Sequence, residues 1–392
     1  MADNYASGKV SRIQHLDGAR GYLLLMMFLA HYHSRYSVPV YIFHHAHFSA
    51  VMDAEFFVMI SGFVCALSYY GAFARSGFMA CLKAVLKRLR WIYLYQVLAA
   101  FAVILLCRHA FPHILLGNVR VNMTDPYYKV ILHIITFVWQ PKFVDILILY
   151  LSIMIFIPLA FRLLMYGRAW LYFAIIAGCW ILAAAGADSR IESWVGQNAA
   201  YLDDYVNIRG YFNAFSYAFL FYLAFYAGWK YVVNGHAHFI KNIIPLKAGY
   251  FYISLVVATF FAISEIGKRY FGTPEWLYSP ARTEITIQAL IYMAAISYGI
   301  YYLLCSNNLP KLLVWARTVL DCILRFRPLV IVGQNALFVY SLHAVLIYFL
   351  SYILIVNDWT LNKLARMTLL LAGMLTLIGA AYLKKQFFPR LP

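Results

Sequence analysis

Long stretches of apolar residues, separated by short polar loops, run along almost the whole chain. A membrane-spanning helix needs about 20 mainly apolar residues. Segments of about that length lie at 18–36, 49–72, 91–109, 144–165, 169–187, 211–233, 246–266, 282–305, 329–356 and 364–386. The stretch 129–139 is too short to cross a bilayer alone and is typical of a re-entrant or interfacial helix. The pattern predicts an all-α, polytopic membrane helical bundle of about 10 transmembrane helices plus this shorter helix.

The placement of lysine and arginine predicts how this bundle is oriented. With ten spans and a cytoplasmic N-terminus, the inner loops hold 19 basic residues against two acidic ones, whereas the outer loops hold 12 and nine. Short cytoplasmic loops carry such an excess of positive charge. We therefore expect one integral-membrane domain, 1–392, with both termini in the cytoplasm: 1–16 as an N-terminal segment and 384–392 as a tail.

The composition supports this interpretation. Of 392 residues, 64% are hydrophobic and only 12% are charged, whereas about a quarter of a soluble domain is charged. A soluble enzyme, a disordered chain and a nucleic-acid-binding protein are excluded. The net charge of +17 lies mainly in the inner loops, where it faces anionic membrane lipids. The six cysteines stand singly with no CxxC pair, which predicts neither a disulfide framework nor a metal site.

Two ionisable residues in the first apolar segment are candidates for function. Charged groups inside a membrane span are costly and usually functional. Arg20 and His31 are eleven residues apart, which places them on one helix face about 16 Å apart along the axis. A guanidinium suits phosphate binding, and a neutral imidazole suits proton abstraction from a hydroxyl. Snorkelling of Arg20 to lipid headgroups and a structural role for His31 explain the pair equally well at this point.

Further polar residues lie in or beside the other apolar segments. Glu55 or Asp145 is a candidate to orient His31, and Ser61 is a formal nucleophile beside Gly62, where small residues more often serve helix packing. Near the inner boundary of the third segment, Arg88, Arg90 and Tyr93 are candidates for phosphate binding, with lipid anchoring as the alternative. The remaining candidates are Asp17, Asp53, Gln140, Asn213 and the buried imidazole of His343.

These residues resemble a known family. Arg20 followed after ten residues by His31 is similar to the signature of acyltransferase family three, the polytopic membrane O-acyltransferases. The chain is further similar to the OpgC branch of that family in the strings Asp53-Ala54-Glu55 to Ser61-Gly62, Arg90-Trp91-Ile92-Tyr93, Gln140-Pro141 to Tyr150, and Gly333 to His343. The resemblance covers about residues 12 to 350. Gln96 and Gln334 depart from it, standing where that branch has a histidine and an arginine.

The resemblance implies an activity as well as a fold. OpgC-like proteins succinylate osmoregulated periplasmic glucans in the bacterial inner membrane. An acyl-CoA co-substrate, expected to be succinyl-CoA, would bind from the cytoplasm near Arg20. His31 would then act as general base toward a hydroxyl of the periplasmic glucan, or of another glycan outside the cytoplasm. No tightly bound cofactor and no metal is expected.

Other classes of protein also place buried Arg, Asp and His in membrane spans. A transporter or flippase for a lipid-linked sugar is the main alternative, although the sequence shows no inverted repeat. A haem protein would pair His31 with His343 but lacks a second histidine pair. An intramembrane serine protease would use Ser61 with His343, in surroundings that do not resemble those enzymes.

Overall fold

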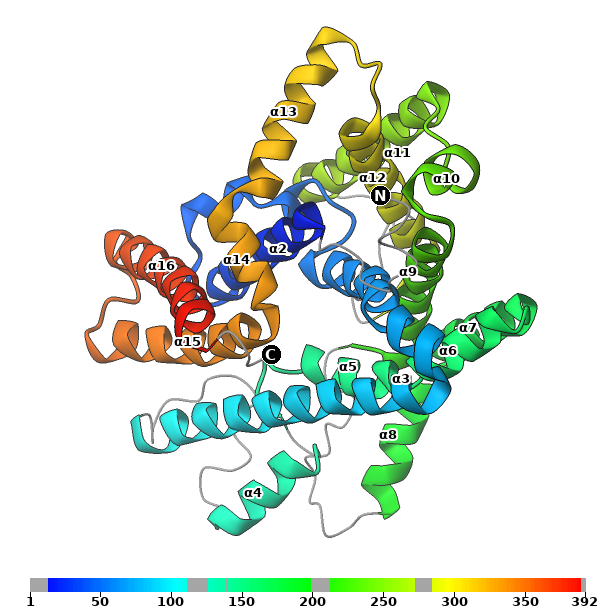
Figure 1. Ribbon diagram of the computed structural model, residues 1–392. Coiled ribbons are helices and arrows are strands. Elements are labelled where there is room, and N and C mark those ends of the chain that lie inside the picture. Colours follow the sequence, from blue (N-terminus) through cyan, green and yellow to red (C-terminus); the bar gives the residue numbers. More distant parts are fainter. Residues whose placement is uncertain (1–12, 111–125, 138–139, 199–211, 272–283, 389–392) are drawn as a thin grey trace.

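The computed structural model describes residues 13–110, 126–137, 140–198, 212–271 and 284–388, and every regular element in these ranges is a helix (Figure 1). The helices are α2 (Gln14–Tyr36), η1 (Pro39–Phe43), η2 (His45–His47), α3 (Asp53–Ala110), α4 (Tyr127–Ile135), α5 (Ile146–Met154), α6 (Ile157–Met165), α7 (Ala169–Ala184), α8 (Ala187–Asn198), α9 (Ala214–Asn234), α10 (His236–His238), η5 (Phe239–Ile243), α11 (Ala248–Phe271), α12 (Ile287–Cys305), α13 (Lys311–Arg325), α14 (Arg327–Gln334), α15 (Ala336–Val356) and α16 (Lys363–Phe387). The predicted all-α class is confirmed.

The number of membrane crossings is only partly fixed by this structure. Five described helices are long and apolar enough to cross a bilayer: α3, α11, α12, α15 and α16. A sixth results if α5 and α6, bent by 41° at their junction, form one span. The other predicted crossings are also helical, but α7 has only 16 residues and α2 carries Asp17, Arg20, Arg35 and three histidines. Ten spans with cytoplasmic termini therefore stay a prediction.

Three predicted segments differ from the helices that the structure contains. The segments 49–72 and 91–109 both belong to α3, because the predicted loop 73–90 is helical too. Gly77, with φ +73° and ψ −166°, bends α3 into two arms, a conformation that glycine adopts without steric cost. The segment 144–165 divides before Pro158, which lacks the N–H that a continuous helix requires.

The segment 329–356 also divides, at Asn335, into α14 and α15. Asn335 Nδ2 donates to the carbonyl of Ile331 at 2.9 Å. This hydrogen bond satisfies a backbone carbonyl in the last turn of α14. Helix α13 was not predicted at all, because its 15 residues lie in the basic loop 306–327. The short stretch 129–139 overlaps α4, which begins two residues earlier and whose nine residues are too few to span a bilayer.

Close helix crossings bring α2 into the middle of the bundle. Helix α2 packs along α14, and Figure 1 shows the two crossing near its centre. A Cβ atom added at Gly18, Gly21 or Gly333 would overlap the backbone of the facing helix segment, so only glycine permits this approach. Gly62 likewise lets α3 pack on α9 against the carbonyl of Phe221, which is the packing role considered for the Ser61-Gly62 pair.

Buried tyrosine hydroxyls satisfy backbone carbonyls where helices break. Tyr222 donates to the carbonyl of Ile153 at 2.6 Å, close to the α5–α6 break, and Tyr340 donates to that of Phe143 at 2.8 Å. An unsatisfied carbonyl in a lipid environment costs several kcal/mol. The tyrosines thus stabilise the irregular backbone that surrounds the central cavity.

Candidate functional site

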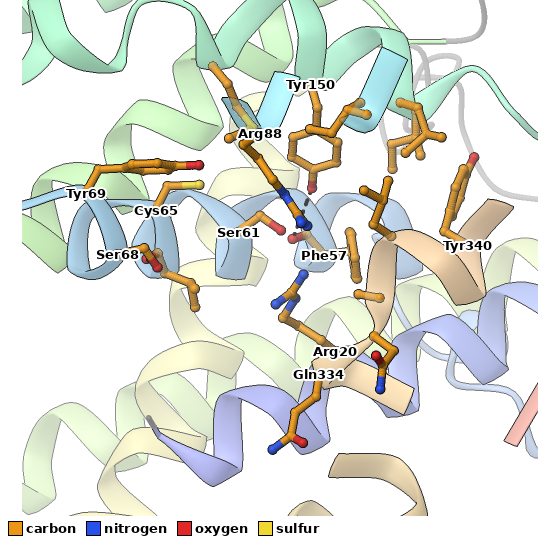
Figure 2. A pocket seen from close by; sticks show the side chains of 18 of the residues that line it. Arg20, Phe57, Ser61, Cys65, Ser68, Tyr69, Arg88, Tyr150, Gln334 and Tyr340 are labelled. Carbon is orange, nitrogen blue, oxygen red and sulfur yellow. Dashed lines mark hydrogen bonds between the residues drawn. The ribbon is translucent and has the colours of Figure 1, made fainter. Parts of the chain in front are cut away.

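A cavity of about 570 Å³ lies where α2, both arms of α3, α5, the α14–α15 junction and α16 meet (Figure 2). Polar and charged groups from helices far apart in sequence share this space. Its polar lining residues are Arg20, Ser61, Ser68, Tyr69, Arg88, Tyr150, Gln334, Asn335, Tyr340 and Lys385. Two sequence-predicted donor residues, Arg20 and Arg88, are therefore brought together with the candidate Ser61.

The lining of the cavity is strongly cationic. Arg20, Arg88 and Lys385 line it, and no Asp or Glu is among its lining residues. The Arg20 guanidinium lies over the Phe57 ring, 5.4 Å from its centroid, and its Nε is buried without a hydrogen-bond partner among the described residues. Figure 2 shows Arg20 and Arg88 reaching toward each other beside the Tyr150 hydroxyl. Two guanidinium groups in one cavity favour binding of an anion, which they can hold by bidentate hydrogen bonds.

A polar network closes the cavity beside Arg20. Gln334 Nε2 donates to Asp17 Oδ2 at 3.4 Å, and Lys385 Nζ donates to Gln334 Oε1 at 3.1 Å. Asp17 is buried. The network links α2, α14 and α16, so Asp17 is part of the site's framework. Lys385 belongs to the last turns of α16, which continues to Phe387 into the predicted tail.

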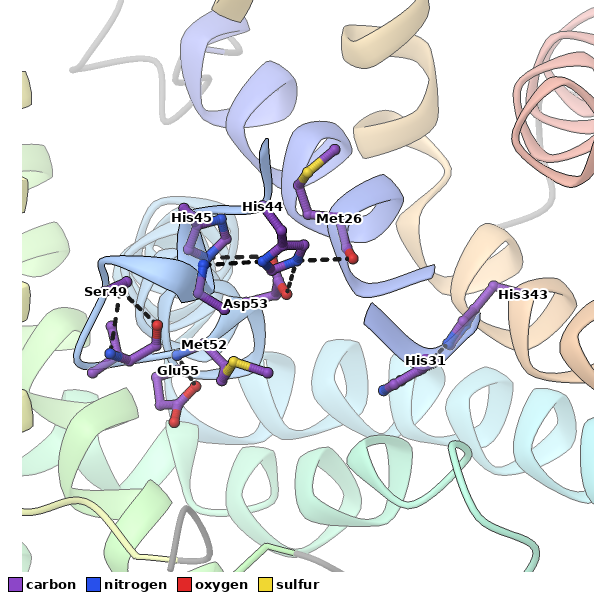
Figure 3. Close-up of polar contacts among 11 residues, drawn as sticks. Met26, His31, His44, His45, Ser49, Met52, Asp53, Glu55 and His343 are labelled. Carbon is purple, nitrogen blue, oxygen red and sulfur yellow. Dashed lines mark hydrogen bonds and ion pairs between the residues drawn. The ribbon is translucent and has the colours of Figure 1, made fainter. Parts of the chain in front are cut away.

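His31 lies beyond the Tyr340 end of the cavity and pairs with His343. His31 Nδ1 and His343 Nε2 are 3.0 Å apart, and the rings stack with centroids 5.2 Å apart (Figure 3). His343 Nδ1 in turn contacts the backbone carbonyl of Tyr340. The structure thus joins two histidines that are 312 residues apart in the sequence.

The hydrogen-bond partners fix the tautomer of each ring. A carbonyl oxygen only accepts, so His343 Nδ1 carries the hydrogen that it donates to Tyr340. A neutral His343 then has a lone pair on Nε2 and accepts the N–H of His31 Nδ1. The remaining nitrogen, Nε2 of His31, consequently keeps its lone pair. That atom is the one able to take a proton from a hydroxyl.

Phe143 holds the histidine pair in place from the loop before α5. Its ring stacks on His31 at a centroid distance of 4.2 Å, and its carbonyl accepts the Tyr340 hydroxyl. Phe143 has φ +77°, an unfavourable backbone conformation for a bulky side chain. Such strained residues cluster at functional sites. Tyr340 connects the two parts of the site, since it lines the cavity and its ring lies 4.6 Å from His343.

The two carboxylates predicted to orient His31 have other positions. Glu55 Oε2 accepts the backbone N–H of Met52 at 3.1 Å, and Figure 3 shows it well away from His31. Asp145 precedes the first residue of α5 and acts electrostatically on Tyr340 and Tyr348. The His31 ring hydrogen-bonds to His343, whereas orientation of His31 by Glu55 or Asp145 stays a prediction.

Several other candidates make contacts outside the cavity. Arg90 is exposed and lies over the Trp91 ring, and Tyr93 donates to the Ile135 carbonyl at 3.1 Å; neither lines the cavity. Gln140 accepts a hydrogen bond from the buried Gln96 at 3.1 Å. Asn213 caps the N-terminus of α9 by accepting two backbone N–H groups.

Asp53 lies in a separate cluster with His44 and His45, whose ligand atoms come within 4.8 Å of one another. Asp53 Oδ2 is 3.2 Å from His44 Nε2, and Oδ1 is 3.5 Å from His45 Nε2 (Figure 3). However, His44 Nδ1 accepts the backbone N–H of Ala46 at 3.0 Å, so the hydrogen of the neutral ring lies on Nε2. His44 therefore donates to Asp53 and to the Met26 carbonyl, and this network fixes the loop between α2 and α3.

Several residues of the cavity and of the surroundings of His31 were not among the sequence-based candidates, among them Tyr340, Phe143, Arg35, Lys142 and Lys385. Arg35 follows His31 by about one helical turn, and this spacing could have indicated that it lies near His31. Phe143 and Lys142 lie within the Gln140-Pro141 string, but nothing in the sequence indicates the positive φ or the stacking on His31.

Comparison with known families identifies the family of the chain. A family model described as OpgC protein matches residues 12–388. The chain belongs to the OpgC family. Neither a search of curated proteins nor a search of solved structures found a match. OpgC membership indicates a glucan-modifying acyltransferase of the succinyltransferase type, and together with the long apolar helices it identifies a membrane protein.

Proposed function

We propose that this OpgC-family protein moves an acyl group, succinyl in the first instance, from cytoplasmic acyl-CoA to a hydroxyl of a periplasmic glucan in the bacterial inner membrane. The observation that carries the proposal is the His31–His343 pair next to a cationic cavity. The histidine pair offers a base, the cavity offers an anion site, and helix α2 supplies a residue to each. Arg20 and His31, eleven residues apart on this helix, contribute to adjoining parts of the site.

The cavity suits the phosphates of the donor. Arg20, Arg88 and Lys385 would neutralise them, and the arm of the donor would extend past Tyr340 toward His31. Membrane lipids surround the bundle, and the predicted cytoplasmic side is the end that holds Lys385 and the start of α2. The glucan hydroxyl would approach His31 from the opposite side, so that the two substrates meet at the imidazole.

The reaction then follows from the tautomers. His31 Nε2 takes the hydroxyl proton as the hydroxyl oxygen attacks the thioester carbonyl carbon, forming a C–O bond. The C–S bond breaks, and the proton passes from His31 to the departing thiolate, which leaves as the free thiol of CoA. In this scheme the positive charge on the His31 ring is shared with His343 through the 3.0 Å hydrogen bond, and no covalent enzyme intermediate forms.

The test is mass spectrometry of glucans from cells that carry the intact gene, His31→Ala, or His236→Ala as a matched control. His236 is exposed on the short helix α10, outside the site. We expect the ester substituent to vanish only in His31→Ala, with equal amounts of each protein in the membrane. An unchanged glucan in the His31→Ala strain would refute the proposal and favour transport without covalent chemistry.

A further inference from the structure

A second cationic group lies on the far side of His31 from the cavity. Arg35 follows His31 on α2 by four residues, so it lies on nearly the same helix face and about 6 Å farther along the axis. Lys142 precedes Phe143, the residue that stacks on His31. The charges of both Arg35 and Lys142 act on the His31 ring. His31 therefore has cations on both sides along the helix axis: Arg20 on one, Arg35 and Lys142 on the other.

Aromatic rings hold Arg35 in a fixed position. Its guanidinium carbon is 5.4 Å from the centroid of Phe143 and 5.0 Å from that of Tyr348. The Lys142 ammonium is 5.6 Å from the centroid of the same Phe143 ring. Contacts of this kind orient a cation without neutralising it. Phe143 is thus shared by the base, by Arg35 and by Lys142.

Arg35 has no anionic partner within the described part of the chain. No hydrogen bond or ion pair joins it to a described residue, and its Nε is buried with no hydrogen-bond partner there. A buried guanidinium nitrogen without a partner is costly, and its planar fork matches a carboxylate. Asp145, which follows Phe143 by two residues, acts electrostatically on Tyr348. Asp145 makes no ion pair with Arg35.

We infer that Arg35, supported by Lys142, forms a carboxylate-binding subsite that selects an acyl group with an acidic end. The inference rests on the proposed function, because it assumes that a thioester reaches His31. In a four-carbon dicarboxylic acyl group, three C–C bonds of about 1.5 Å each place the free carboxylate about 4 Å from the reacting carbonyl carbon. Adding one hydrogen-bond length of about 3 Å gives a reach of about 7 Å, which is comparable with the axial offset of about 6 Å between the backbone positions of His31 and Arg35.

The subsite predicts discrimination between donors that differ only in charge. A carboxylate paired with Arg35 gains from a charge-assisted hydrogen bond, whereas a neutral chain of equal length leaves the guanidinium unpaired. The wild-type protein should therefore transfer succinyl faster than butyryl. Removing the guanidinium should abolish this preference without removing the base.

The experiment uses the full-length protein in proteoliposomes, an uncharged glucan as acceptor, and succinyl-CoA or butyryl-CoA as donor. For Arg35→Gln we expect kcat/KM with succinyl-CoA to fall about 10- to 100-fold more than kcat/KM with butyryl-CoA, as loss of a hydrogen bond to a charged group predicts. Arg35→Lys should retain part of the preference. Arg168→Gln, an exposed arginine at the start of α7, is the control for lost charge and should match wild type.

Each other result has a distinct meaning. Equal losses with both donors would overturn the inference and assign Arg35 a structural role. No loss with either donor on the uncharged glucan, but a loss with a glucan bearing anionic groups, would overturn it by assigning Arg35 to the acceptor. If the wild-type protein transfers from neither donor, the proposed function fails, independently of Arg35.

Discussion

The His31–His343 hydrogen bond predicts a specific kinetic defect when His343 is replaced by alanine. In the resting state the bond joins two neutral rings, and during proton abstraction the donor ring becomes an imidazolium. A neutral hydrogen bond contributes about 0.5–1.5 kcal/mol and a charged one about 1.5–3 kcal/mol. The difference of about 1–1.5 kcal/mol is gained only in the transition state, so its loss lowers kcat by about tenfold.

The same reasoning separates His343 from His31 by size of effect and by coupling. His31→Ala removes the base itself and should lower kcat by about 100- to 10,000-fold. Since His343 acts through His31, the double variant should be no slower than His31→Ala alone. His343→Gln, whose side-chain oxygen can accept the His31 N–H, should recover part of the rate that His343→Ala loses.

The assay is single-turnover acyl transfer in proteoliposomes at saturating donor, compared between wild type, the two single variants and the double variant. Ser341→Ala is the matched control, because Ser341 is buried on the same helix and donates only to the Leu337 carbonyl in the same helix. A double variant that loses the product of the two single effects would refute the relay. An increase in KM with unchanged kcat for His343→Ala would do so as well, since it would indicate a role in binding.

Three further predictions test the surroundings of the site. Arg20→Ala should raise the donor KM by about tenfold or more, as loss of a charged contact predicts. Arg90→Ala, outside the cavity, should leave the donor KM unchanged. Equal effects of the two substitutions would contradict the cavity as donor site. Gly333→Ala should lower the yield of folded protein in detergent, because its Cβ would overlap the Asp17 carbonyl; a normal thermal unfolding temperature would show that α2 and α14 are farther apart. Burial lowers the pKa of His45, in the loop between α2 and α3, below its ordinary 6.5. The unfolded chain therefore binds a proton that the folded chain does not, and stability should fall as the pH drops below about 6.5; thermal unfolding of His45→Gln should show a weaker decline, and an identical decline would refute the assignment.

The cationic cavity shows what sequence periodicity can and cannot predict. Arg88 and Arg90 belong to the same basic stretch, and both were candidates for phosphate binding. Two residues along a helix turn the side chain by about 200°, so the two cannot face one cavity. The structure turns Arg88 inward and Arg90 outward. Choosing between them requires knowing which face of α3 packs on α2 and α5, and that information lies in the fold.

The histidine pair shows a different limit. The spacing of Arg20 and His31 predicted one shared face, and His343 was recognised as a buried imidazole. The contact between His31 and His343, however, depends on the break of the chain at Asn335 and on the close approach of α2 to α14 at Gly21 and Gly333. Neither the break nor the crossing follows from hydropathy, because the whole stretch 329–356 is apolar enough for one continuous span.

Helix α2 explains why the site needs those irregular partners. Arg20, His31 and Arg35 lie along about 22 Å of one helix, within roughly 60° around its axis, so a single rigid element sets the distances among the anion site, the base and the proposed carboxylate site. A rigid helix cannot also close around a substrate. The contacts around this helix include non-helical backbone at Phe143 and Asn335, where the chain leaves helical geometry and where Tyr340 and Phe143 join the cavity to the histidines. Replacing either break with a continuous helix would therefore keep the spacing along α2 but separate the base from the cavity.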